Sequence, residues 1–153
     1  MELIRIGAKA PDFNLDNVRD EAISLADFRG KKVLLSWHPL AWTGVCGDQM
    51  RSLEVNFDKF QALNAVALGL NVDPSTSKKA WGAVLGVKKT ALLSDFWPHG
   101  QAASAYGVFL AEEGFSQRAN IIVDETGVVR WAKVYPISQL PDINEVLQAL
   151  AQL

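Results

Sequence analysis

A single cysteine, Cys46, is the most reactive side chain in this sequence. It follows a proline and a threonine at a fixed spacing, Pro39-x-x-x-Thr43-x-x-Cys46. A cysteine thiolate is a strong nucleophile and can be oxidised reversibly. One cysteine cannot form an intramolecular disulfide or a cysteine-rich metal cluster. Any thiol chemistry in this chain must therefore use one sulfur atom and an external partner.

The elements around Cys46 are predicted to place its sulfur at the start of a helix. Residues Lys32–Trp37 form a short apolar run that is typical of a buried strand. From Cys46 to Phe60, apolar residues recur at steps of four and three, which indicates one face of an amphipathic helix. With Thr43 as the N-cap, its hydroxyl oxygen is expected to accept the backbone N–H of Cys46. The sulfur would then lie near the positive end of the helix dipole, which favours the thiolate.

The remaining patterns predict an α/β fold with a central mixed sheet and helices on both faces. A second apolar run, Ala65–Val72, completes a strand–helix–strand unit and predicts a parallel crossover. Two hairpins are predicted: a small one of Phe13–Leu15 and Ala22–Leu25 ahead of the main sheet, and one of Arg118–Asp124 and Val128–Tyr135 that turns at Gly127. A helix over Ser75–Leu85 that ends at Gly86 and a strand over Ala91–Leu93 are predicted between them. A last helix is predicted to start with Pro141. This order is that of a thioredoxin-like fold.

Length, charge and hydropathy limit the classes of function. A chain of 153 residues predicts one domain over residues 1–153. Fifteen Lys and Arg against seventeen Asp and Glu give a net charge of −2, which leaves no excess of cations for a phosphate backbone. No apolar stretch approaches the roughly 18 residues that a membrane span needs, and the first residues lack the pattern of a signal peptide. We therefore expect a soluble, cytoplasmic protein that binds neither nucleic acid nor membranes.

The motif around Cys46 resembles the active-site signature of the peroxiredoxins, the alkyl hydroperoxide reductase and thiol-specific antioxidant family. Other segments resemble this family in order and spacing: Gly7–Phe13, Ile23–Gly30, Asn71–Ser75 with Trp81, and Arg118 ahead of Ile121–Asp124. Two more, Leu92–Gly100 and Ala105–Phe109, resemble the one-cysteine bacterial subgroup typified by the E-type proteins. The resemblance covers most of the chain.

The resemblance implies a thiol-dependent peroxidase with a role for each motif residue. The Cys46 thiolate would attack a peroxide oxygen and become a sulfenic acid. Thr43 would position the peroxide, Arg118 would stabilise the thiolate and the transition state, and Pro39 would shield the sulfur from solvent. Without a second cysteine, an external thiol, either a small thiol or a redoxin, must reduce the sulfenic acid. The family also implies a homodimer and no cofactor. No metal is expected, because the two histidines lie far apart and have no carboxylate at metal-ligand spacing beside them.

Three further residues are candidates for substrate binding. Trp42 and Trp81 can line a peroxide pocket or simply pack in the core. Gln49 stands three residues after Cys46, where the family commonly has Glu, and Trp37-His38 stand before Pro39 in place of two aromatic residues. These departures bear on substrate preference and hydrogen bonding more than on the reaction itself.

The sequence also allows two other hypotheses about function. A thioredoxin-like redox sensor or binding protein would oxidise Cys46 with slow turnover. A cysteine hydrolase would pair Cys46 with His38, whereas His99 is expected to be an ordinary loop residue. The segment Gly86–Thr90 lacks the full phosphate-loop pattern, so a nucleotide site is not expected.

Overall fold

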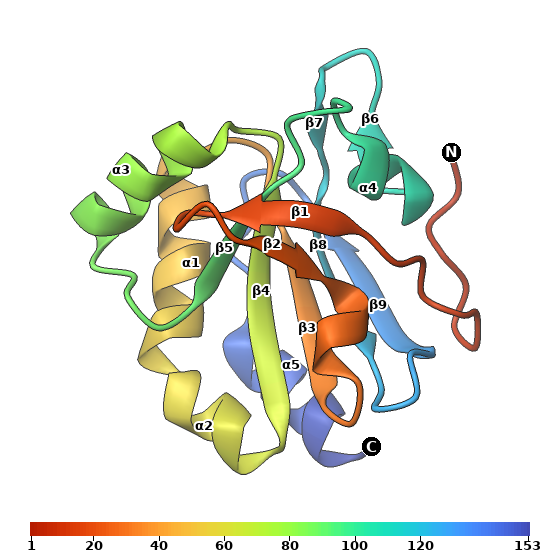
Figure 1. Ribbon diagram of the computed structural model, residues 1–153. Helices are drawn as coiled ribbons and strands as arrows, with labels where there is room; N and C mark the ends of the chain where they lie inside the picture. The colour runs from red at the N-terminus through yellow and green to blue at the C-terminus, as the bar shows by residue number, and fades with distance from the viewer.

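The computed structural model describes residues 1–153 and contains a seven-stranded mixed sheet, shown in Figure 1. Its strands lie in the order β2-β1-β5-β4-β3-β8-β9. The bounds are β1 (Asn14–Asn17), β2 (Ala22–Ser24), β3 (Lys32–Trp37), β4 (Ala65–Asn71), β5 (Ala91–Ser94), β8 (Arg118–Val123) and β9 (Val129–Tyr135). The three central strands β5, β4 and β3 are parallel, and all other pairs are antiparallel. The predicted mixed sheet and parallel crossover are confirmed.

Helices cover both faces of the sheet, but unequally. One face carries four of them, α1 (Gly44–Val55), α2 (Phe57–Ala62), α3 (Ser75–Leu85) and α5 (Ile143–Ala151). The other face is covered by the N-terminal segment, a 3₁₀ helix (Leu25–Phe28) and α4 (Gln101–Ala105). Figure 1 shows α4 at the end of the molecule opposite α2. The sheet therefore separates two apolar cores.

Strand β3 contributes side chains to both cores because successive residues point to opposite faces. Val33, Leu35 and Trp37 belong to the core beneath the N-terminal segment, whereas Leu34 belongs to the core that contains Cys46. All six residues of the strand are buried. This central strand fixes where the chain must turn into the segment that carries Pro39 and Thr43.

Three details differ from the sequence-based predictions. The predicted helix from Cys46 to Phe60 is interrupted at Asn56, whose side-chain amide donates to the Ser52 carbonyl at 2.7 Å and competes with the regular backbone pattern. Pro141 lies before the last helix, which Asp142 caps by accepting the Asn144 N–H at 2.9 Å. The front hairpin of β1 and β2 is confirmed, but it extends the main sheet because β1 also pairs with β5.

Three short elements were not predicted: the 3₁₀ helix Leu25–Phe28, the helix α4, and a hairpin of β6 (Phe109–Leu110) and β7 (Phe115–Ser116). Each has two to five residues, too few to show a hydrophobic period. The hairpin matters for the site because the Ser116 hydroxyl donates to the His38 carbonyl at 3.1 Å.

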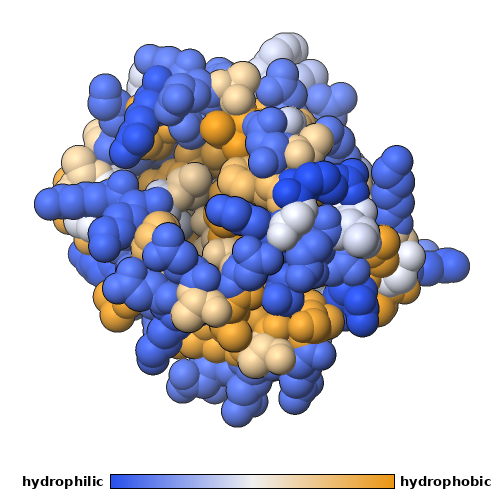
Figure 2. Space-filling model, turned by 60° about the horizontal axis from the view of Figure 1, so that its bottom comes forward, coloured by the Kyte–Doolittle hydropathy of each residue, from blue (hydrophilic) through white to orange (hydrophobic).

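The molecular surface is mixed. In Figure 2, which brings the lower part of the molecule forward, hydrophilic side chains cover most of the face and hydrophobic ones emerge in patches between them. None of the helices is both long and apolar enough to cross a membrane.

Candidate active site

Cys46, Arg118 and the Pro39–Thr43 segment meet where strand β3 ends, helix α1 begins and strand β8 starts. Because β3 and β8 are antiparallel with Trp37 opposite Ala119, the first residue of β8 lies beside the end of β3. Helix α1 starts a few residues after β3, so its first turn returns to the same place. The topology thus brings together residues 72 positions apart in sequence.

The Cys46 sulfur is buried and accepts a hydrogen bond from a guanidinium group. Cys46 is 1% exposed and Arg118 is 2% exposed. Arg118 Nη1 lies 3.3 Å from Cys46 Sγ. A hydrogen bond from a cation to sulfur is strongest when the sulfur carries a negative charge. The geometry thus places a cationic donor directly on the Cys46 sulfur.

Arg118 is held by protein groups on two sides. Its Nε and Nη2 both donate to the Ile137 carbonyl, at 2.9 and 2.7 Å, and its Nη1 also donates to Gln49 Oε1 at 2.9 Å. The planar guanidinium is therefore fixed in orientation as well as in position. Nη2 carries two N–H groups and donates to one protein acceptor, the Ile137 carbonyl.

Gln49 supports Arg118 from within helix α1. It is 2% exposed, and its Nε2 donates to Ser36 Oγ at 2.7 Å and to the Trp37 carbonyl at 3.1 Å. Both ends of the amide already have protein partners. The structure thus places Gln49 behind the arginine, where it orients Arg118, and this placement disfavours the direct substrate contact that the sequence led us to expect.

Thr43 is the N-cap of α1, but its hydroxyl does not make the predicted bond. The residue has extended backbone geometry, and its carbonyl accepts the Gly47 N–H at 3.0 Å. The hydroxyl donates instead to the Leu40 carbonyl at 2.7 Å, so the prediction that it accepts the Cys46 N–H is wrong. The reason is local, because the turn from Leu40 to Thr43 brings a carbonyl within reach of the hydroxyl. Its oxygen lone pairs remain free, and Thr43 is exposed whereas Pro39 is buried.

The two candidate tryptophans lie in different surroundings. Trp42 is 56% exposed, has a positive φ of 68°, and donates from Nε1 to Ser77 Oγ at 3.1 Å. Trp81 is 2% exposed, and its ring lies 5.5 Å from the His38 ring, centroid to centroid. Trp81 is therefore placed as a packing residue, and Trp42 ties the active-site segment to helix α3.

His38 does not pair with Cys46. Its Nδ1 faces the Ser36 carbonyl at 3.3 Å, and its buried Nε2 has no hydrogen-bond partner. Burial lowers the pKa of His38 well below its usual value, and the nearby charges of Lys78 and Arg118 lower it further. Because the His38 ring makes no hydrogen bond to the sulfur, the geometry does not support the hypothesis of a cysteine hydrolase. His99 bonds to the Phe96 and Gly114 carbonyls, as befits a loop residue.

Two groups near the site were missed at the level of sequence. The Ile137 carbonyl is a backbone atom, and no side-chain pattern signals its role. The burial of Lys78 could have been predicted from the sequence. Lys78 lies three residues before Trp81 and seven before Leu85, which places it on the apolar face of the predicted helix. The structure shows it to be 0% exposed.

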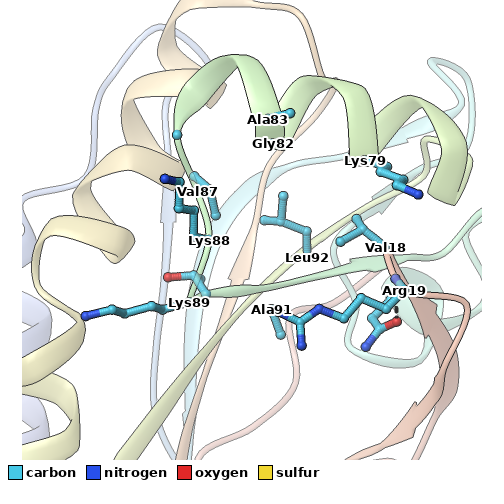
Figure 3. Close-up of a pocket in the computed structure, with 13 residues that line it drawn as sticks. Val18, Arg19, Lys79, Gly82, Ala83, Val87, Lys88, Lys89, Ala91 and Leu92 are labelled. Atoms are coloured by element: carbon cyan, nitrogen blue, oxygen red, sulfur yellow. Dashed lines mark hydrogen bonds between the residues drawn. The ribbon is translucent and has the colours of Figure 1, made fainter.

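The largest cavity of the molecule lies elsewhere. It measures about 520 Å³ and opens between helix α3 and strand β5, with Lys79 and Arg19 on the same side of it in Figure 3. No residue of the Cys46 site lines it. The backbone amides of Lys88, Lys89 and Thr90 at its rim all donate to the Glu54 carboxylate, so this segment has no free amides to bind a phosphate.

A buried cysteine at a helix N-terminus, paired with an arginine from a neighbouring strand in a thioredoxin-like sheet, defines the class of thiol-based redox proteins. Residues 6–132 match the AhpC/TSA family, and the chain belongs to this family. It is 36% identical over 152 residues to alkyl hydroperoxide reductase E of Mycobacterium tuberculosis, covering 99% of each chain. It is also 32% identical to a mitochondrial thioredoxin-dependent peroxide reductase of Drosophila melanogaster, over 96% of this chain and 66% of that one.

A solved structure agrees with these sequence matches. The reduced 2-Cys peroxiredoxin of Plasmodium vivax superposes with a TM-score of 0.86 at 29% identity, over 95% of this chain and 79% of that chain. The predicted thioredoxin-like fold and the predicted peroxiredoxin family are both confirmed. The chain is a thiol-dependent peroxidase with one cysteine available for the reaction.

Proposed function

We propose that Cys46 is the residue that reduces peroxides in this protein. The main support for this role is the 3.3 Å contact between its sulfur and Arg118 Nη1 at the start of helix α1. The thiolate attacks one oxygen of the peroxide, the O–O bond breaks, and its electron pair leaves with the other oxygen as water or an alcohol after protonation. Cys46 gains the attacked oxygen as a sulfenic acid, so sulfur is oxidised and the peroxide is reduced.

We assign the neighbouring residues supporting roles. The second N–H of Arg118 Nη2 would donate to a peroxide oxygen and stabilise the charge that develops as the O–O bond breaks. Because the Thr43 hydrogen is used by Leu40, its oxygen would accept the peroxide O–H and orient the substrate. Buried Pro39 would exclude water from the sulfur.

An external thiol completes the cycle. Cys46 is the only cysteine of the chain, so neither this chain nor a second copy can supply a separate resolving cysteine. One thiol would condense with the sulfenic acid to a mixed disulfide and release water. A second thiol would then restore Cys46 by disulfide exchange. The name of the Drosophila relative supports a thioredoxin-type reductant as one candidate, alongside a small thiol.

Peroxide consumption tests this proposal. Purified protein is mixed with hydrogen peroxide or an organic hydroperoxide, together with a small thiol or thioredoxin and its reductase. We expect turnover that Cys46→Ser abolishes, because serine keeps the fold but lacks an oxidisable sulfur. Substantial consumption by Cys46→Ser would contradict the proposal. Stoichiometric oxidation without turnover by any thiol would favour a redox sensor instead.

We also propose a homodimer in the cytoplasm. A free thiol that cycles with external thiols requires a reducing compartment, which supports the location. Strand β9 ends one edge of the sheet, and the exposed apolar residues Val134, Ile137 and Leu140 lie along and after it, which supports association of two copies.

A further inference from the structure

Lys78 is a buried lysine that the reaction outlined above does not use. It lies in the first half of helix α3, is 0% exposed, and takes part in none of the salt bridges of the molecule. A buried ammonium without a contacting carboxylate is costly, and an apolar side chain of the same length would avoid that cost. The lysine therefore needs an explanation beyond packing.

A chain of hydrogen bonds leads from Lys78 to the active-site segment. Lys78 Nζ donates to Asn71 Oδ1 at 2.8 Å and lies 3.5 Å from the Gly69 carbonyl. Asn71 Nδ2 donates to Asp73 Oδ2 at 2.6 Å. The same Asp73 oxygen accepts the backbone N–H of Ala41 at 2.7 Å. Ala41 lies between Pro39 and Thr43, so the chain ends on the backbone that carries both residues.

The residue before Lys78 holds the same segment at a second point. Ser77 Oγ accepts Trp42 Nε1 at 3.1 Å. Helix α3 is thus linked to two successive residues of the segment, to Ala41 through Asn71 and Asp73 and to Trp42 directly from Ser77. Because Trp42 has a positive φ of 68°, the turn is strained and requires such external contacts to keep its shape.

We propose that Lys78 is a positioning residue for peroxide reduction, whose ammonium group, through Asn71 and Asp73, fixes the Pro39–Thr43 backbone beside Cys46. This inference rests on the proposed function of Cys46, because it explains how the residues around that sulfur keep their places. Lys78 does not touch the reacting atoms. It acts on them through the segment that would bind the peroxide.

The charges around Lys78 make this support dependent on pH. Burial lowers the pKa of Lys78 to about 7, against the opposing attraction of Asp73, Cys46 and Asp95. The groups that face it are His38 at the end of β3, Cys46 on α1, Asp73 after β4 and Asp95 after β5. Below this pKa the ammonium attracts Asp73 and a Cys46 thiolate. Above it the neutral amine keeps the hydrogen bond to Asn71 but loses the attraction.

The test compares Lys78→Met with Lys79→Met. Methionine has nearly the length of lysine and suits a buried site, and the exposed Lys79 next to it on the same helix is the matched control. Rapid mixing with hydrogen peroxide, followed by tryptophan fluorescence, gives the rate of Cys46 oxidation from pH 5.5 to 9. We expect Lys78→Met to be about ten- to a hundredfold slower at pH 6.5 and Lys79→Met to match wild type. The ratio of the wild-type oxidation rate to that of Lys78→Met should also fall as the pH rises through 7.

A second variant tests whether Lys78 acts through Asp73. If both belong to one chain of contacts, Lys78→Met combined with Asp73→Asn should be no slower than the slower single variant. A rate of Lys78→Met equal to wild type at pH 6.5, a rate ratio that does not change with pH, or additive losses in the double variant would each overturn the inference. Slow oxidation of the wild-type protein itself would instead contradict the proposed function of Cys46. Circular dichroism of each variant confirms that the fold is retained.

Discussion

Arg118 makes contacts that a different cation could not reproduce. Its guanidinium donates twice to the Ile137 carbonyl while Nη1 reaches both Gln49 and the Cys46 sulfur. An ammonium group has no such planar fork and cannot hold the same orientation. Arg118→Lys is therefore expected to slow Cys46 oxidation by about a hundredfold, in the range found when one donor to a developing charge is removed.

The measurement for Arg118→Lys is the second-order rate constant of oxidation by hydrogen peroxide. Arg130→Lys is the control, because Arg130 pairs with Asp124 on the surface, away from the sulfur. A rate for Arg118→Lys equal to wild type would show that a positive charge alone suffices at this position.

The lowered pKa of Lys78 also makes the stability of the fold depend on pH. Its pKa is about 7 in the folded protein, against 10.5 for an ordinary lysine. Between these values the unfolded chain binds more protons than the folded one, so the contribution of this residue to stability rises with pH across that window. Below pH 7 the folded protein carries a buried ammonium. Lys78→Met should therefore raise Tm at pH 6 by several degrees, an advantage that shrinks toward pH 10.

Thermal unfolding followed by circular dichroism checks this expectation, with Lys79→Met as the control that leaves Tm unchanged. The combination of a slower and more stable variant distinguishes a positioning residue from a structural one. A lower Tm of Lys78→Met at pH 6 would contradict the account.

Helix α1 and strand β4 pack closely because β4 has a glycine at their contact. A Cβ added at Gly69 would overlap the Met50 sulfur and approach Leu92 Cδ2 to 2.9 Å. Met50 lies one helical turn after Cys46 and is 0% exposed, so a shift of its side chain disturbs a closely packed core. Gly69→Ala is expected to lower the free energy of unfolding by about 1–3 kcal/mol through overpacking.

Urea unfolding measures the effect of Gly69→Ala. Gly44→Ala is the matched control, because Gly44 also lies in a regular element and a Cβ there meets no atom within 4 Å. Equal stability of the two variants would mean that α1 can shift along the sheet without cost.

At the scale of elements, the sequence predicted those that have a clear period. The apolar run Lys32–Trp37 is strand β3 as predicted, and the turn at Gly127 joins β8 and β9, with a φ of 86° that favours glycine. Elements of two to five residues, such as α4 and the β6–β7 hairpin, have no such period. The break at Asn56 depends on one side-chain contact to Ser52, which a hydrophobic pattern does not report.

The sequence predicted the residues of the candidate site but not their hydrogen-bond partners. The spacing of Pro39, Thr43 and Cys46 and the resemblance to a family indicated which residues to examine. Their partners depend on the folded geometry: the Thr43 hydroxyl bonds to a carbonyl that only the turn brings near, and Arg118 bonds to a backbone atom of Ile137.

For the whole molecule, the proposed dimer makes a prediction about mass. The N-terminal residues Gly7 and Ala8 pair with Val129 at the start of the outer strand β9, but no strand pairs with the rest of its outer edge, which a second copy can cover. Sedimentation velocity of the reduced protein at micromolar concentration is expected to give twice the mass of the chain. A single species with the mass of one chain would contradict the proposal of a homodimer.

In the proposed reaction, the buried Cys46 thiol reduces peroxide with the help of Arg118. Rapid mixing of the reduced protein with hydrogen peroxide, with tryptophan fluorescence and intact mass recorded together, tests it most directly. We expect a fluorescence change much faster than the oxidation of a free thiol, one added oxygen atom at Cys46, and neither change in Cys46→Ser. Oxidation no faster than that of a free thiol, or an oxygen added elsewhere in the chain, would contradict it.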